Sequence, residues 1–267
     1  MGRVSFVLGS LVTSSLLVLG LTAPASAASK YADTDYVALG DSYSSGVGAP
    51  GQVGLCLQSA NGYPGQWAGR NDPKSFTDLA CSGAVTGDVI NYQLPFVSSR
   101  TDLVSITIGG NDAGFASTVI SCTISSDAAC LQTIADARAT ITGPLAAKLD
   151  NTYAGIRRKA PNAQVVVLGY PALFDTSTSS CGIGGMSLVK RRALNDGAQV
   201  LDELIQARAA AAGFTFSDVR DEFAGHGICA ASPYLNGLTV LPPTNSFHPN
   251  KSGYTYGYLP ALSGAVG

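Results

Sequence analysis

The chain is short of charged residues, which make up 13% of its 267 positions against about 25% in an average soluble protein. Its 16 basic and 18 acidic residues give a net charge of −2 and form no run of either sign. Electrostatic binding to nucleic acid or to an anionic membrane is therefore not expected. The sequence also lacks a C-x-x-C motif and any Cys/His cluster, so we predict neither a metal site nor a cofactor.

Long apolar segments are absent after the first residues of the chain. Residues 1–27 have the parts of a secretory signal peptide: a basic Arg3, an apolar stretch at 4–21, and the small residues Ala-Ser-Ala at 25–27. We therefore expect cleavage there, a secreted protein, and one domain over residues 28–267. A retained membrane anchor is the alternative, and the small-residue site argues against it. No further hydrophobic repeat is present, so a monomer is expected.

Cysteine is present six times, and in an exported chain this indicates disulfide bonds. A zinc site is the alternative, and the missing C-x-x-C motif argues against it. Pairing between neighbours along the chain would close three loop-rich segments, and each bond would stabilise the fold by roughly 2–4 kcal/mol. The predicted pairs are Cys56–Cys81, Cys122–Cys130 and Cys181–Cys229.

Short runs rich in apolar and β-branched residues alternate with helical patterns along the chain. The predicted strands are Tyr36–Leu39, Phe76–Ala80, Leu103–Ile108, Gln164–Leu168 and Phe214–Phe216. Apolar residues between Leu131 and Ile156 recur at helical spacing and predict one long amphipathic helix. A second helix is predicted over Leu188–Ala212, ended by Gly213. This alternation predicts an α/β fold with a parallel sheet covered on both faces.

Polar motifs follow the predicted strands where each one ends. Gly40-Asp41-Ser42 follows the first strand, Gly83 comes after the second, and Gly109-Gly110-Asn111 follows the third. Because sites in parallel sheets form at the carboxyl ends of the strands, we expect these residues at one edge of the sheet. Ser42 is a candidate nucleophile, whereas Gly83 and Asn111 are candidate oxyanion donors. Each motif is also common in ordinary turns, and the Gly-x-Ser-x-Gly elbow of α/β-hydrolases is absent.

Histidine occurs only twice, at His226 and His248. His248 stands in Ser246-Phe247-His248-Pro249, where the proline stiffens the following turn. An imidazole can take the proton of an attacking hydroxyl, so His248 is the candidate general base. A surface-loop histidine is the alternative for His248, and we interpret His226, near Cys229, as structural.

These motifs together resemble the blocks of the SGNH (GDSL-type) hydrolases. That family carries Gly-Asp-Ser, a glycine, Gly-x-Asn-Asp and a late His-Pro, which match 40–42, 83, 109–112 and 248–249 here. The resemblance spans nearly all of the chain after residue 27. It is closest to the secreted actinobacterial lipases and esterases.

The resemblance implies a three-layer α/β/α sandwich around a five-stranded parallel, flavodoxin-like sheet. It also implies roles: Ser42 as nucleophile, His248 as general base, and an oxyanion hole made by the Ser42 and Gly83 backbones and the Asn111 side chain. The secreted relatives carry three disulfides in sequential order, in agreement with the pairs above.

One position departs from the family pattern. Most members have Asp three residues before the histidine, and this chain has Asn245. Some secreted relatives orient the histidine with a main-chain carbonyl instead. We therefore predict a Ser-His dyad in which the Ser246 carbonyl orients His248, with Asn245 as the second candidate.

The predicted function is a secreted carboxylester hydrolase, a lipase or esterase, that acts on acyl-ester or lipid substrates through an acyl-enzyme. A phospholipase acyl hydrolase or a carbohydrate-ester deacetylase would use the same residues. A non-catalytic secreted binding protein is a third alternative. It would be expected to lose Ser42, Asn111 or His248, and all three are present.

Overall fold

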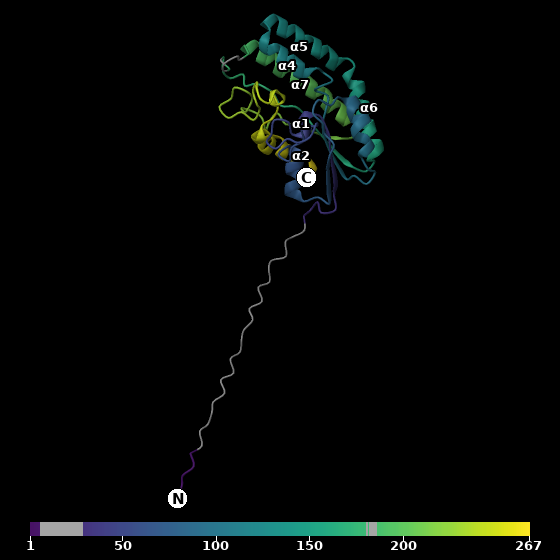
Figure 1. Cartoon of the computed structure of the whole chain (residues 1–267). Helices are drawn as coiled ribbons and strands as arrows, with labels where there is room; N and C mark the ends of the chain where they lie inside the picture. The colour runs from purple at the N-terminus through teal and green to yellow at the C-terminus, as the bar shows by residue number, and fades with distance from the viewer. Residues whose placement is uncertain (6–28, 180, 182–185) are drawn as a thin grey trace.

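The computed structural model describes residues 1–5, 29–179, 181 and 186–267 (Figure 1). Most of the predicted signal peptide therefore lies outside the described residues. Within those residues no helix is long and apolar enough to cross a membrane. The same residues include no group of three or more His, Cys, Asp or Glu side chains that could hold a metal ion.

Five parallel strands form one sheet in the order β2-β1-β3-β4-β5. The strands are β1 (Asp35–Gly40), β2 (Ser75–Asp78), β3 (Leu103–Thr107), β4 (Gln164–Leu168) and β5 (Thr215–Ser217). β3 is buried along its whole length and β4 along all but its first residue, as expected for central strands covered on both faces. The predicted parallel sheet and its flavodoxin-like order are confirmed.

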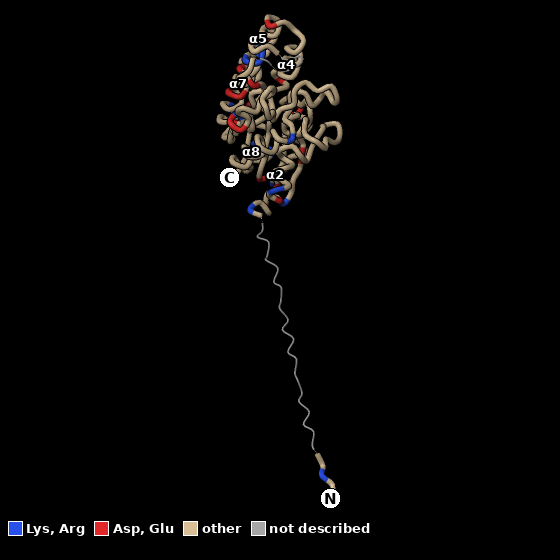
Figure 2. The backbone as a smooth tube through the Cα atoms, turned by 90° about the vertical axis from the view of Figure 1, so that its left-hand side faces the viewer, with Lys and Arg blue, Asp and Glu red and all other residues tan. Residues whose placement is uncertain are grey.

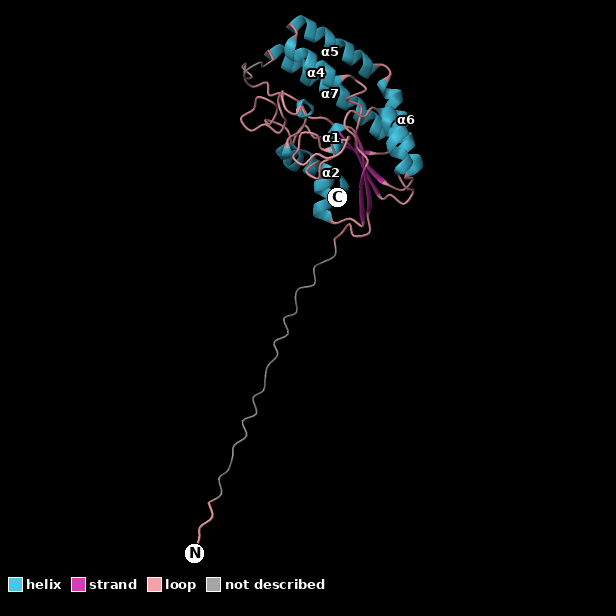
Figure 3. Cartoon of the chain, in the orientation of Figure 1, coloured by secondary structure: helices cyan, strands magenta, loops and turns pink. Residues whose placement is uncertain are grey.

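Helices cover both faces of the sheet and complete the three predicted layers (Figure 3). α2 (Tyr63–Asn71) and α8 (Leu259–Val266) contact each other on one side, whereas α6 (Leu145–Lys159) and α7 (Leu188–Ala211) pack together on the other. α4 (Phe115–Ile124) and α5 (Asp127–Thr142) extend the second side beyond the strand ends. The remaining short elements are α1 (Ser42–Ser45), α3 (Thr86–Asp88), η1 (Val89–Gln93), η2 (Leu94–Phe96), η3 (Pro243–Asn245) and η4 (Gly253–Tyr258).

The single long helix predicted over Leu131–Ile156 is wrong. The structure has two helices there, α5 and α6, which are separated at Gly143 and Pro144. Gly143 has φ −103° and ψ −105°, outside the helical region, and proline lacks the N–H that a continuous helix needs. Apolar residues kept helical spacing across the break, so their periodicity alone did not reveal it.

The predicted helix over Leu188–Ala212 is confirmed to within one residue as α7. Ser187 begins it by accepting a hydrogen bond from the Lys190 backbone. Gly213 follows its end with φ +70°, a left-handed conformation that glycine adopts without strain.

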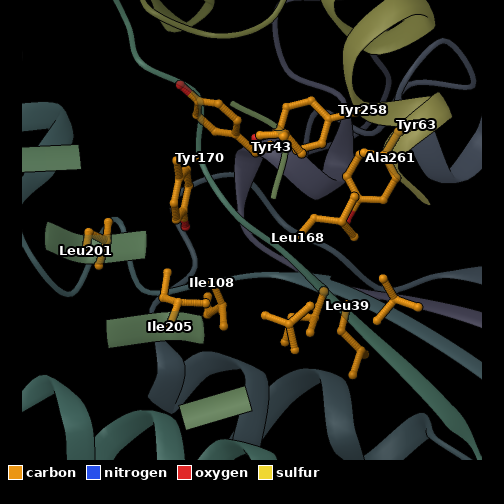
Figure 4. Packing of buried hydrophobic residues seen from close by; sticks show 14 of the residues in the cluster. Leu39, Tyr43, Tyr63, Ile108, Leu168, Tyr170, Leu201, Ile205, Tyr258 and Ala261 are labelled. Atoms are coloured by element: carbon orange, nitrogen blue, oxygen red, sulfur yellow. The ribbon is translucent and has the colours of Figure 1, made fainter. Parts of the chain in front are cut away.

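The core lies between the sheet and its helices, and Figure 4 shows two kinds of packing within it. Ile108 lies beside Ile205 of α7 and Leu39 lies further along the same layer, and all three are buried. Tyrosine rings gather on the other side of the sheet, where Tyr63 and Tyr258 stack with centroids 5.3 Å apart. These buried rings lie close to the carboxyl end of β1.

Three disulfides join the cysteines in the predicted pairs Cys56–Cys81, Cys122–Cys130 and Cys181–Cys229. The setting of the second pair differs from the loop-rich segment expected, because Cys122 lies in α4 and Cys130 in α5. This bond therefore ties two consecutive helices together.

Candidate active site

Ser42 is the first residue of α1 and follows β1 after a sharp turn. Gly40 has φ +119°, and a Cβ at this position would lie 2.3 Å from the Thr107 carbonyl oxygen of β3. Asp41 then caps the helix, because its side chain accepts a hydrogen bond from the Tyr43 backbone. Glycine and a capping aspartate thus place the Ser42 hydroxyl at the carboxyl edge of the sheet.

The Ser42 hydroxyl and the His248 imidazole are hydrogen-bonded although they lie far apart in the sequence. Ser42 Oγ is 2.7 Å from His248 Nε2, and His248 Nδ1 is 2.9 Å from the Ser246 carbonyl oxygen. A carbonyl only accepts, so Nδ1 carries the proton and Nε2 is left to accept from the hydroxyl. This is the arrangement that an activated serine requires.

Burial lowers the pKa of His248 to about 4, although the Ser246 and Thr244 carbonyls act in the opposite direction. The imidazole is therefore neutral at neutral pH and free to take a proton. A carboxylate partner would raise this pKa more strongly than a carbonyl dipole does. The Ser246 carbonyl thus contacts the ring without adding a charge to the site.

Asn245, the second candidate for orienting His248, has another partner. Its side-chain oxygen accepts a hydrogen bond of 2.8 Å from Gln52 Nε2. That contact links the turn before His248 to the loop after α1. Of the two candidates, the geometry favours the Ser246 carbonyl.

The two further oxyanion candidates line the same cavity as Ser42 and His248. This cavity, of about 240 Å³, is bordered by Gly83 and by Asn111. One hydrogen of the Asn111 amide is directed to the Ala84 carbonyl oxygen at 3.0 Å, which fixes the side chain and leaves its second hydrogen for a ligand. Gly83 has φ +81°, and its segment is held by the Cys56–Cys81 disulfide.

Tyr170 is a residue of this site that the sequence did not single out. Its hydroxyl donates to the Asp41 carboxylate and accepts from the Gly110 backbone N–H at 3.0 Å. Burial raises the pKa of Asp41 to about 7, and it holds the pKa of Tyr170 well above its usual range. Tyr170 comes soon after β4, so the strand-end argument used for Ser42 and Asn111 would have pointed to it as well.

Tyr43 connects the turn at Ser42 to the segment that contains His248. Its hydroxyl donates to the Phe247 carbonyl oxygen at 2.7 Å, and its ring centroid lies 5.2 Å from that of His248. Phe247 has φ +62°, a strained value for a bulky residue. The strained residue directly precedes His248, and the buried Tyr43 hydroxyl helps to hold it in place.

One wall of the cavity is apolar and comes mainly from α4, a helix that the sequence did not predict. Phe115, Val119 and Ile120 line it from α4, and Leu173 and Phe247 line it from elsewhere. The polar lining of the same cavity includes Ser42, Asn111 and His248. An ester could therefore place its carbonyl at Ser42 and its hydrocarbon chain along α4.

His226 lies outside the set of residues that line this cavity. Its Nδ1 is 2.7 Å from the Ser232 carbonyl oxygen, and its ring stacks on Tyr234 with centroids 3.8 Å apart. These contacts agree with a structural role.

Comparison with known proteins gives a consistent result. The GDSL-like lipase/acylhydrolase family matches residues 38–256. Lipase 1 of Streptomyces coelicolor is 47% identical over 262 residues, which cover 97% of each chain. Among solved structures, an extracellular lipase from Streptomyces rimosus is 50% identical with a TM-score of 0.84, covering 87% of this chain and 99% of that one. Phospholipase A1 from Streptomyces albidoflavus is 42% identical with a TM-score of 0.85, covering 88% and 100%.

Proposed function

The chain belongs to the GDSL-like lipase/acylhydrolase family and is a carboxylic ester hydrolase, and we propose that Ser42 is its nucleophile and His248 its general base. The observation that carries this assignment is the continuous chain of hydrogen bonds from Ser42 Oγ through the imidazole to the Ser246 carbonyl. Such a chain activates a serine without a metal or cofactor.

In the first half of the reaction, Ser42 Oγ attacks the ester carbonyl carbon while His248 Nε2 takes the hydroxyl proton. The negative charge on the carbonyl oxygen is then stabilised by the Ser42 and Gly83 backbone N–H groups and the Asn111 amide, each contributing roughly 3–4 kcal/mol. His248 returns the proton to the leaving alcohol, and an acyl-enzyme remains. The Ser246 carbonyl dipole stabilises the imidazolium during each proton transfer.

In the second half, His248 takes a proton from water, and the resulting attack on the acyl-enzyme forms a second tetrahedral species. Its collapse releases the carboxylic acid and returns the proton to Ser42. The same oxyanion donors serve both halves, because the developing charge lies at the same place.

The apolar wall favours substrates with a hydrocarbon acyl chain over acetylated sugars. A phospholipase acyl hydrolase is the second candidate, and the 42% identity to a phospholipase A1 supports it. Secretion as a monomer is part of the proposal, supported by the signal-peptide features of residues 1–27 and by the three disulfides.

The test is hydrolysis of p-nitrophenyl esters of increasing acyl length by the oxidised protein and by Ser42→Ala. We expect activity that the substitution abolishes and that favours chains longer than acetyl. Hydrolysis by Ser42→Ala at the parent rate would overturn the assignment of the nucleophile. A preference for acetyl esters would instead favour a deacetylase.

A further inference from the structure

Large apolar side chains reach solvent in three segments that lie next to the cavity. The segments are the loop 51–58, helix α4 and the turn 238–244. Seven side chains in them, between 51% and 100% exposed, are here called the apolar rim: Val53, Leu55, Ile120, Ile124, Leu238, Val240 and Leu241. Exposed apolar side chains that cluster in this way mark a site of interaction.

The apolar rim is continuous with the cavity on the α4 side. Ile120 lines the cavity and is also half exposed. Ile124 lies one helical turn further along α4 and is almost fully exposed. A hydrocarbon surface that contacts Ile124 would therefore extend along the helix to the cavity wall.

The turn 238–244 borders the cavity on the histidine side. Pro243 and Thr244 line the cavity, and the exposed Val240 and Leu241 lie just before them in the same turn. The Thr239 backbone donates to Ser246 Oγ at 2.9 Å, which fixes the turn to the segment that orients His248.

Leu55, in the loop 51–58, is the most exposed member of the apolar rim. The next residue, Cys56, is bonded to Cys81, and its carbonyl accepts from the Ser82 backbone, which lines the cavity. Gln52 at the other end of this loop contacts Asn245. The loop is thus attached to two sides of the site.

Charge is absent from all three segments and from long stretches around them. Residues 42–69, 113–126 and 223–250 contain no Lys, Arg, Asp or Glu. Figure 2 shows charged residues along α5 and α7 and near α2, whereas the loops that project on the side opposite α7 are tan. Contact between such a surface and an apolar phase carries no cost for desolvating charges. The surface also has no positive charge that would attract an anionic lipid.

We propose that the apolar rim docks the enzyme on a lipid surface that has no net charge, with the mouth of the cavity facing the lipid. This inference rests on the proposed function, because docking serves to pass an acyl chain from the lipid phase along α4 to Ser42. A second copy of the chain is disfavoured as the occupant, since a partner seated on the three segments would close the cavity that the substrate must enter. The apolar side chains contribute the binding free energy, and salt has little effect on it.

The test is binding of the Ser42→Ala protein, which leaves lipid intact, to phosphatidylcholine vesicles in a sedimentation assay. The rim variant adds Leu55→Ser, Ile124→Ser and Val240→Ser. The matched control adds Tyr92→Ser and Phe96→Ser, which remove apolar side chains of 71% and 72% exposure that do not line the cavity. We expect the rim variant to bind at least roughly tenfold more weakly, since each lost side chain removes apolar burial.

Binding by the control should equal that of the parent and persist in high salt. Equal binding by the rim variant and the control would overturn the proposal, as would binding that requires anionic lipid and falls with salt. The proposal would also be overturned if the parent forms a dimer and does not bind vesicles while the rim variant is a monomer. That result would identify a second copy of the chain as the occupant.

Activity separates this inference from the proposed function. With Ser42 restored, the rim variant should hydrolyse soluble p-nitrophenyl butyrate at the parent rate and hydrolyse vesicle lipid more slowly. Loss of both rates in the rim variant alone would mean that the three segments serve the site itself, which overturns docking as their role. A parent that binds vesicles through the rim and hydrolyses no ester would overturn the proposed function and leave docking intact.

Discussion

The hydroxyl of Tyr170 donates a hydrogen bond to the buried carboxylate of Asp41. Asp41 caps the helix that begins with Ser42, while the same hydroxyl accepts from Gly110, next to Asn111. One side chain therefore connects the turn of the candidate nucleophile with the turn of a candidate oxyanion donor. Tyr170 itself is fixed by its backbone N–H, which donates to Asp202 at 2.8 Å.

Tyr170→Phe should lower kcat roughly tenfold on a short soluble ester while KM stays nearly unchanged, because a lost hydrogen bond of about 1.5 kcal/mol loosens both turns without removing a substrate contact. Steady-state kinetics measure the split. The matched control is Tyr153→Phe, since the Tyr153 hydroxyl is buried without a hydrogen-bond partner among the described residues. An equal loss of kcat in both variants would contradict a positioning role for Tyr170.

Asn245→Ala should keep most of the activity, because the Ser246 carbonyl and not the Asn245 side chain contacts His248 Nδ1. The variant loses only the contact with Gln52, so we expect Gln52→Ala to give a similarly small effect. The measurement is kcat/KM on one ester for both variants beside Ser42→Ala. If the Asn245→Ala protein is folded and as inactive as Ser42→Ala, the proposed dyad is wrong.

The pH profile of kcat/KM should have its acidic limb near pH 4 rather than near the ordinary histidine pKa of 6.5. The base must be neutral to act, and burial lowers the pKa of His248, so protonation removes activity only when the pH falls through about 4. Circular dichroism at each pH separates loss of the base from acid unfolding. A limb near pH 6.5 in folded protein would show that the imidazole is better solvated than its burial implies.

Asp202→Asn should make thermal stability less dependent on pH. Burial raises the pKa of the Asp202 carboxyl from 3.8 to about 8. Between these values the folded chain holds a proton that the unfolded chain releases, so stability that is fully present below pH 3.8 is lost as the pH rises toward 8. The Tm should therefore fall less between pH 5 and pH 8 in Asp202→Asn than in the parent. The exposed Asp196→Asn serves as control, and an unchanged pH dependence in both variants would refute the argument.

Short-range patterns were enough to predict the strands and a parallel sheet, whereas the flavodoxin-like strand order was implied by the resemblance to the family. β-branched runs such as Leu103–Thr107 form strands wherever they are buried on both faces, and their alternation with helices permits few topologies. The same patterns failed between α5 and α6, where the apolar periodicity continued across Gly143 and Pro144. The break depends on backbone conformation at two residues, which side-chain spacing does not report.

Local sequence also pointed to the site residues that end strands, because topology brings strand ends to one edge. It did not reveal Tyr170, Tyr43 or the α4 wall. Their parts in the site arise from contacts between segments remote in the sequence, such as the Tyr43 hydroxyl with the Phe247 carbonyl. No local pattern encodes such a contact.

The sequence by itself determined the α/β class, the family, and the residue types that ester hydrolysis requires, since each of these follows from local propensity or from motifs in a set order. The sequence left two candidates for orienting His248, and the tertiary structure distinguished them by placing the Ser246 carbonyl oxygen against Nδ1 and the Asn245 side chain against Gln52. Every residue has a backbone carbonyl, so the fold determines which one faces Nδ1. The lowered pKa of His248 likewise comes from burial, which the packing of the whole chain creates.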